Sequence, residues 1–226
     1  MTMPLMMFAA GFGTRMKSLT AHQPKPMVQV AGMPLIDHAL ALTNGQPVGP
    51  IVANLHYHGD QIRSHLADCD VVFSDETDAL LETGGGLRAA MPLLGGSPVM
   101  TLNTDAVWDG PNPIAALLSA WHPRMDALLL TVPPRNAHGH KGSGDFEIQE
   151  DGRLIRAAGQ VYTGLQIIRT DDLHDIADPA FSLNLVWDKI AARGGLYGLS
   201  YGGKWCDVGQ PASIQIAQDM IGYHDV

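Results

Sequence analysis

Short, continuously apolar segments alternate along the chain with longer segments whose apolar residues recur at helical spacing. Continuous apolar runs are typical of strands buried on both faces of a parallel sheet, and we expect such strands at residues 5–8, 51–55, 71–73, 98–102 and 127–132. Helical spacing predicts helices at 34–42, 113–121 and 211–221, and a further helix that carries Ile62 and begins with Asp60 as its N-cap. Strands that alternate with helices predict an α/β fold with a mostly parallel sheet.

The pattern changes after Pro133. Residues 135–144 are rich in Gly, His and Asn, which predicts a mobile loop. Short apolar runs at 146–148, 154–155 and 162–168 surround the turn Asp151-Gly152 and predict a small antiparallel excursion from the parallel sheet in the C-terminal half. Two more short strands are expected at 196–200 and 205–208. No internal repeat or low-complexity tract divides the chain, so we expect a single domain over residues 1–226.

Composition and charge restrict the class of protein. The chain has 226 residues, of which 46% are hydrophobic, and this is enough for a substantial core. A formal net charge of −9 argues against non-specific binding to nucleic acid or to anionic membranes. The two cysteines are too few for a disulfide scaffold, and no apolar run reaches the length of a membrane helix. We therefore expect a cytoplasmic protein that is a monomer or a small homo-oligomer.

A glycine-containing loop with nearby cationic side chains follows the first predicted strand. It reads Ala9-Ala10-Gly11-Phe12-Gly13-Thr14-Arg15-Met16, and Pro24-Lys25-Pro26 comes shortly after it. Glycines let backbone N–H groups approach an anion closely, and successive N–H groups form a concave nest for phosphate oxygens. Arg15 can bind phosphate through two N–H groups, and Lys25 adds a point charge. The stretch therefore predicts a polyphosphate-binding loop.

Two common phosphate-binding motifs do not fit this loop. The Walker A motif fails because no Gly-Lys-Ser/Thr ends the loop. The dinucleotide fingerprint G-x-G-x-x-G fails because Met16 stands at the position of the third glycine.

Three further clusters carry glycines or carboxylates. Leu81-Glu82-Thr83-Gly84-Gly85-Gly86 precedes a helical pattern, and it suits either close approach of the backbone to a flat ring or anion, or a flexible loop. Asp105 follows the strand expected at 98–102, where a carboxylate can hold Mg²⁺ or can cap a turn. Asp207, within Trp205-Cys206-Asp207-Val208-Gly209, can be a turn residue or can supply, together with Asp105, the pair of carboxylates that magnesium-dependent phosphoryl chemistry needs.

Together these four clusters resemble the signature of sugar-1-phosphate nucleotidyltransferases. That family carries G-x-G-T-R-M and P-K-P, then L-E-T-G-G-G and W-x-D-V-G, in the same order and over nearly the whole chain. The resemblance implies a Rossmann-like fold of the nucleotide-diphospho-sugar transferase type, with a mixed sheet flanked by helices. It also implies that residues 1–132 mainly bind the nucleotide and residues 133–210 mainly bind the sugar. One departure is Thr104, where the family usually has glycine, and this bears on sugar preference more than on metal binding.

The resemblance also implies roles for individual residues. Arg15 and Lys25 are the implied catalytic residues, with Arg15 on the departing pyrophosphate and Lys25 between the α-phosphate and the incoming sugar phosphate. The implied Mg²⁺ ligands are Asp105 and Asp207. The implied nucleotide contacts lie in the two glycine-rich segments and at one strand end: Ala9, Ala10, Gly11, Gly13, Thr14, Glu82, Thr83, Gly84 and Asn103. The implied sugar contacts are Asp145, Thr163 and Gly164.

The reaction implied by the resemblance transfers a nucleotidyl group from a nucleoside triphosphate to a sugar 1-phosphate. Within the family, the chain most resembles uridylyltransferases of cell-wall sugar recycling, which implies UTP as donor and N-acetylmuramate 1-phosphate as acceptor. Guanylyl transfer to mannose 1-phosphate and cytidylyl transfer to choline phosphate are alternatives with the same chemistry. A catalytically silent nucleotide-sugar sensor is an alternative of another class. An NAD-dependent oxidoreductase is disfavoured because the dinucleotide fingerprint is incomplete.

Overall fold

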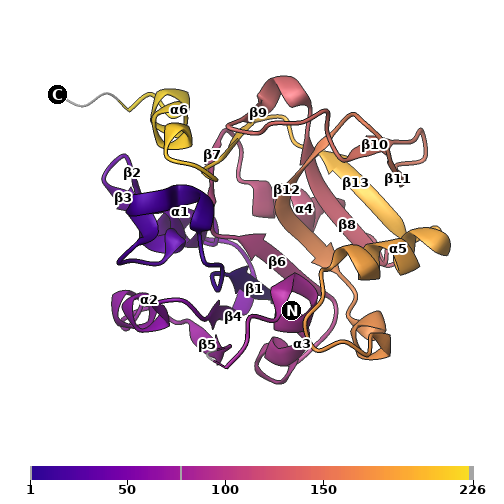
Figure 1. Ribbon diagram of the computed structural model, residues 1–226. Coiled ribbons are helices and arrows are strands. Elements are labelled where there is room, and N and C mark those ends of the chain that lie inside the picture. The colour runs from indigo at the N-terminus through magenta and orange to yellow at the C-terminus, as the bar shows by residue number, and fades with distance from the viewer. Residues whose placement is uncertain (1, 77, 224–226) are drawn as a thin grey trace.

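A mixed sheet of seven strands forms the centre of the molecule (Figure 1). The structure is a computed structural model that describes residues 2–76 and 78–223. β12 runs antiparallel to both of its neighbours, and the other six strands run parallel to one another. The prediction of a mostly parallel mixed sheet is confirmed. In spatial order the strands are β13 (Leu196–Ser200), β8 (Ala127–Val132), β12 (Val161–Ile168), β6 (Val99–Asn103), β1 (Met3–Phe8), β4 (Val48–Leu55) and β5 (Val72–Asp75).

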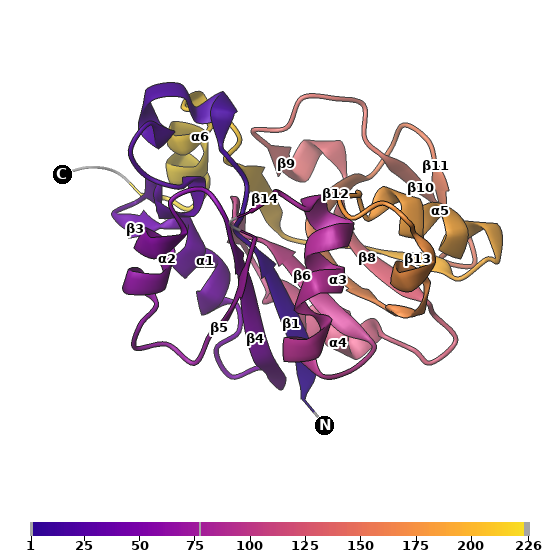
Figure 2. The same ribbon diagram turned by 60° about the horizontal axis from the view of Figure 1, so that its bottom comes forward.

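Helices cover both faces of this sheet because the buried side chains of β1 alternate between the faces. Leu5 and Met7 belong to the core that α1, α2 and α4 complete, whereas Met6 belongs to the core that α3 and α5 complete. Figure 2 shows α3 lying against the sheet. The helices are α1 (Leu35–Ala41), α2 (Gly59–His65), α3 (Glu82–Leu94), α4 (Pro113–Ala120), α5 (Asn184–Ala192) and α6 (Ala212–Met220). Within the described residues, no helix has the length and apolar character that a membrane crossing requires.

The C-terminal segment packs against the segment that follows β1. β14 (Lys204–Asp207) pairs with β7 (Ala106–Asp109) and with β9 (Ala137–His138), and α6 then packs against β14 and β2 (Gln29–Val30). Figures 1 and 2 both show the yellow α6 beside the indigo N-terminal region. Met16 and Val208 share one apolar cluster there. This packing brings the end of β14 to the glycine-rich loop.

Three local predictions are wrong. Residues 135–144 are not loop throughout, because residues 137–138 form β9 and pair with β14. The strand at 161–168 belongs to the main sheet, so the separate antiparallel unit is only the hairpin of β10 (Phe146–Ile148) and β11 (Leu154–Arg156). The N-cap of α2 is His58, in a left-handed conformation, instead of Asp60. β3 (Met33–Pro34) and the 3₁₀ segments Thr14–Thr20, Lys25–Met27, Pro134–Asn136 and Asp171–Asp175 complete the fold.

Candidate active site

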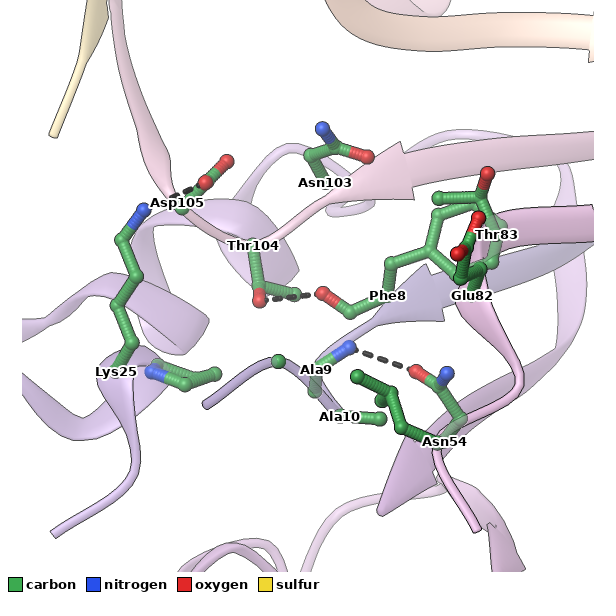
Figure 3. Close-up of a pocket in the computed structure, with 13 residues that line it drawn as sticks. Phe8, Ala9, Ala10, Lys25, Asn54, Glu82, Thr83, Asn103, Thr104 and Asp105 are labelled. Atoms are coloured by element: carbon green, nitrogen blue, oxygen red, sulfur yellow. Dashed lines mark hydrogen bonds and ion pairs between the residues drawn. The ribbon is translucent and has the colours of Figure 1, made fainter. Parts of the chain in front are cut away.

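Three adjoining cavities lie at the carboxyl ends of the parallel strands. The chain runs from β1 to β4 on one side of β1, and β6 then pairs with the other side of β1. In open α/β sheets, ligands bind where the strand order reverses direction in this way. The central cavity has a volume of about 220 Å³ and opens where β1 and β6 end (Figure 3). It shares Gly11, Lys25 and Asp105 with a glycine-loop cavity of about 210 Å³. It shares Thr83 and Asn103 with a cavity of about 260 Å³ beside the β10–β11 hairpin, here called the hairpin cavity.

The glycine loop is shaped by contacts that exclude larger residues. Gly13 has a φ of 63°, and a Cβ there would lie 2.8 Å from the Cβ of Lys25 and 3.1 Å from the Cγ2 of Thr20. The hydroxyl of Thr20 donates to the Gly13 carbonyl at 3.0 Å. A Cβ on Gly11, in contrast, would meet no atom within 4 Å. The loop is therefore anchored at Gly13 and leaves open space at Gly11, Thr14 and Arg15, which all line the glycine-loop cavity.

Lys25 crosses from this loop to the end of β6. Its side chain is only 11% exposed, and its Nζ lies 2.6 Å from Asp105 Oδ2 (Figure 3). Proline on both sides, at positions 24 and 26, fixes the backbone around it. Thr104 has no positive φ, so glycine is not required there, and its hydroxyl donates to the Phe8 carbonyl at 2.8 Å. That bond joins the ends of β1 and β6 and holds Asp105 at the mouth of the site.

Asp207 reaches the same place from β14. A Cβ on Gly209 would lie 2.9 Å from Asp207 Oδ2 and 3.3 Å from Arg15 Cζ, so both side chains close around that glycine. Burial raises the pKa of Asp207, and repulsion from the Asp105 carboxylate adds to the rise; Lys25, Arg15 and His140 oppose it. The structure therefore brings Arg15, Lys25, Asp105 and Asp207 into one electrostatic neighbourhood.

The two carboxylates fit a divalent cation. They repel each other, and the positive charge of a bound divalent cation would offset that repulsion. Among residues 2–76 and 78–223, no group of three or more acidic, histidine or cysteine side chains forms a complete cage. Two carboxylates whose ion takes its other ligands from water and phosphate are the usual Mg²⁺ arrangement at phosphate-binding sites.

The second glycine-rich segment, residues 81–86, is largely helical, whereas the sequence placed its glycines before a helix. Gly84, Gly85 and Gly86 lie within the first two turns of α3, not in a loop before it. A Cβ on Gly84 would lie within 3 Å of Phe181, and Gly84 is not among the residues that line the three cavities. These glycines therefore let α3 pack closely against its neighbours. Glu82, with a strained φ of 58°, and Thr83 are the members of the segment that line the central cavity.

Sequence reasoning missed a hydrogen-bond chain behind the central cavity. The Ala9 N–H donates to Asn54 Oδ1 at 2.7 Å, and Asn54 Nδ2 donates to Glu76 Oε1 at 2.6 Å. The other Glu76 oxygen accepts from the Leu81 N–H at 3.0 Å. Glu76 is only 3% exposed. This chain joins the ends of β1, β4 and β5 to the start of α3. It occupies the N–H of Ala9, which lines the central cavity, so the nucleotide contact predicted at Ala9 would use other atoms of that residue.

We expect Glu76→Ala to lower the free energy of unfolding by about 2–4 kcal/mol, because the buried amide of Asn54 and the part-buried N–H of Leu81 both lose their acceptor. Urea unfolding measures the change. Glu76→Gln keeps an acceptor oxygen and is expected to lose less, and Glu150→Ala, at an exposed glutamate, is the control. Equal stability of Glu76→Ala and the wild type would contradict a supporting role for the buried carboxylate.

Of the three expected sugar contacts, Asp145 lies at the hairpin cavity, whereas Thr163 and Gly164 do not line it. Asp145 lines the hairpin cavity and accepts from the Tyr162 N–H at 2.9 Å. Thr163 is buried, and its hydroxyl donates to the Leu130 carbonyl at 2.7 Å, so it faces the sheet. A Cβ on Gly164 would lie 2.7 Å from the Cβ of Asn103, which explains the glycine there. Sequence reasoning missed several residues that line this cavity: Arg156, Tyr162, Gln166, Asn184 and Trp187.

This fold, with a glycine loop, two cations and two carboxylates at the carboxyl edge of its sheet, is that of a nucleotidyltransferase. The chain belongs to the family of MobA-like NTP transferase domains, whose model matches residues 6–141. It is 37% identical to an N-acetylmuramate alpha-1-phosphate uridylyltransferase of Caulobacter vibrioides over 96% of both chains. It is 32% identical to the Neisseria meningitidis protein of the same name, over 97% of this chain and 99% of that one. The resemblance inferred from the four motifs is confirmed, and the oxidoreductase alternative is excluded.

Solved structures share the fold at lower identity. HddC from Yersinia pseudotuberculosis, complexed with GMP-PN, superposes with a TM-score of 0.76 at 22% identity, over 96% of this chain and 99% of that one. The inositol-1-phosphate CTP transferase from T. maritima superposes with a TM-score of 0.74 at 16% identity, over 99% and 98%. The expected nucleotidyltransferase fold is therefore confirmed.

Proposed function

We propose that this protein transfers the uridylyl group of UTP to N-acetylmuramate 1-phosphate, with Mg²⁺, and releases pyrophosphate. The proposal rests on one observation above all: the 2.6 Å pair of Lys25 and Asp105 lies on the wall shared by the central and glycine-loop cavities. A triphosphate in one cavity and an acceptor phosphate beside it would meet at that pair. The names of the relatives from Caulobacter vibrioides and Neisseria meningitidis support this donor and this acceptor.

The three cavities suggest how the substrates divide among them. The nucleoside would occupy the central cavity, against Ala10, Glu82, Thr83 and Asn103. Its triphosphate would extend along Gly11, Gly13 and Thr14 toward Arg15. The sugar would occupy the hairpin cavity near Asp145, and Asn103 lies at its junction with the central cavity. Residues up to 132 would thus serve mainly the nucleotide, and residues after 133 mainly the sugar.

The negative charge of the two substrates determines what the site must do in the reaction. An oxygen of the sugar phosphate attacks the α-phosphorus in line, and the bond to the β-phosphate oxygen breaks as pyrophosphate leaves. The attacking phosphate is already an anion, so no general base is required, and catalysis depends on positioning and on neutralising charge. Lys25 lies at the shared wall and would contact both the α-phosphate and the acceptor phosphate. Arg15 lines the glycine-loop cavity and would contact the departing phosphates. Asp105 and Asp207 would hold Mg²⁺, which would polarise the α-phosphate when bound.

A pyrophosphate-release assay with four nucleoside triphosphates and a panel of acceptor phosphates tests the proposal. We expect the highest kcat/KM with UTP and N-acetylmuramate 1-phosphate, and loss of turnover on chelation of divalent metal. Preference for GTP with mannose 1-phosphate, or for CTP with choline phosphate, would replace the donor and acceptor but keep the chemistry. Binding of nucleotide with no pyrophosphate release from any pair would instead indicate a silent sensor.

A further inference from the structure

The hairpin cavity holds a single cationic side chain. Among the described residues that line it, Arg156 is the one lysine or arginine, and Asp145 is the one carboxylate. Arg156 is the last residue of β11, so the hairpin places it at the end of the cavity wall built by Phe146 and Trp187. A neutral sugar needs hydroxyl and amide partners and no net charge beside it. A fixed positive charge indicates an anionic group on the ligand.

The guanidinium of Arg156 is held in place by two aromatic rings. Its Cζ lies 4.9 Å from the centre of the Phe146 ring and 5.6 Å from that of the Trp187 ring. Nη2 donates to Asn184 Oδ1 at 2.8 Å and to Asp188 Oδ1 at 3.2 Å. Nε and Nη1 have no protein partner within the part of the chain that the structure describes. The ring contacts orient the group, and its free N–H donors remain available to a planar anion.

The ion pair with Asp188 does not saturate this charge. The side chains of Arg156 and Asp188 are 47% and 62% exposed, and pairs so exposed contribute little. Arg193, by comparison, is bound by two carboxylates, those of Asp126 and Asp172. An incoming carboxylate can therefore share the Arg156 guanidinium without breaking a buried pair.

We propose that Arg156 is a specificity-determining residue that binds a carboxylate on the acceptor sugar and thereby selects it over neutral sugar 1-phosphates. In N-acetylmuramate 1-phosphate this group is the carboxylate of the lactyl ether. The inference rests on the proposed function, which places the acceptor phosphate at Lys25 and Asp105 and the sugar ring in the hairpin cavity. The central cavity, which Lys25 lines, and the hairpin cavity, which Arg156 lines, share Phe8, Thr83 and Asn103 in their walls.

Arg156→Gln, assayed with two acceptors, tests the inference. N-acetylmuramate 1-phosphate and N-acetylglucosamine 1-phosphate share a ring and a phosphate and differ by the lactyl group. With UTP, we expect the variant to lose about 10–100-fold in kcat/KM for the lactyl sugar, mainly through a higher KM. For N-acetylglucosamine 1-phosphate the change should stay within about threefold. Arg153→Gln is the matched control, because Arg153 lies in the same hairpin, pairs with Asp151 and does not line the cavity.

Two further measurements make the outcome decisive. Arg156→Lys keeps a charge without the planar fork, and it should retain part of the preference for the lactyl sugar; thermal unfolding of each variant monitors the fold. Calorimetric binding of both sugar phosphates tests Arg156 even where turnover is absent. If Arg156→Gln lost the same factor in kcat/KM for both acceptors, or lost none for either, the inference would be overturned, while the proposal of nucleotidyl transfer would stand. No pyrophosphate from the wild type with any acceptor would instead defeat the proposed function.

Discussion

Replacing Lys25 with methionine is expected to lower kcat by about 10³-fold, which is the cost of removing one preorganised charge from a site where negative charge develops. Methionine preserves most of the aliphatic stem, which packs against the Gly13 backbone. The variant should therefore fold, and thermal unfolding should occur near the wild-type temperature. Single-turnover measurement of pyrophosphate release separates the loss of chemistry from any loss of substrate binding.

Lys17→Met is the matched control for this experiment. Lys17 lies in the same N-terminal segment but is exposed and does not line the three cavities. Near-normal kcat in Lys25→Met would mean that the pair with Asp105 serves only to hold the glycine loop in place. A rise in the KM for UTP with unchanged kcat would place Lys25 in substrate binding instead of the chemical step.

The parts of the fold that could be predicted from sequence are those set by local burial. The strand expected at 127–132 has those bounds in the structure, because all of its residues are buried and the apolar run is uninterrupted. The pairing of short strands could not be predicted in this way. β9 has two residues, and its partner in β14 is distant in sequence, so nothing in residues 137–138 signals a strand. The place of β12 in the main sheet likewise depends on its partners and not on its composition.

The candidate site also has residues that could be predicted from the sequence and residues that could not. The four motif residues Arg15, Lys25, Asp105 and Asp207 could be selected from sequence because their types and order carry the chemistry, and the structure brings them together. Glu76 could not, because its role arises only where three strand ends and a helix start meet. Arg156 is one of the twelve lysines and arginines besides Arg15 and Lys25, and only the cavity distinguishes it from the others. Long-range packing, unlike residue type, leaves no local signal.

Asp207→Asn is expected to abolish turnover and, at the same time, to stabilise the metal-free protein. Burial and repulsion from Asp105 raise the pKa of Asp207 above its ordinary value. At a pH below the unfolded-state pKa, the carboxyl is protonated in both states and its ionisation costs the fold nothing. As pH rises through the higher pKa of the folded state, the buried group becomes charged, and the fold loses stability. Asparagine has nearly the same shape and never carries that charge.

Thermal unfolding in the presence of a chelator measures this effect. At pH 7 we expect the variant to unfold about 2–4 °C higher than the wild type, which corresponds to about 1 kcal/mol for a chain of this length. The difference should shrink as the pH is lowered toward the ordinary carboxyl range. Added Mg²⁺ should raise the unfolding temperature of the wild type but not that of the variant, because the variant lacks one of the two carboxylates. Asp219→Asn, at an exposed position in α6, is the control and should respond to Mg²⁺ as the wild type does. A less stable Asp207→Asn, or one that retains turnover, would mean that the carboxylate is held by its neighbours for structure and not for the metal.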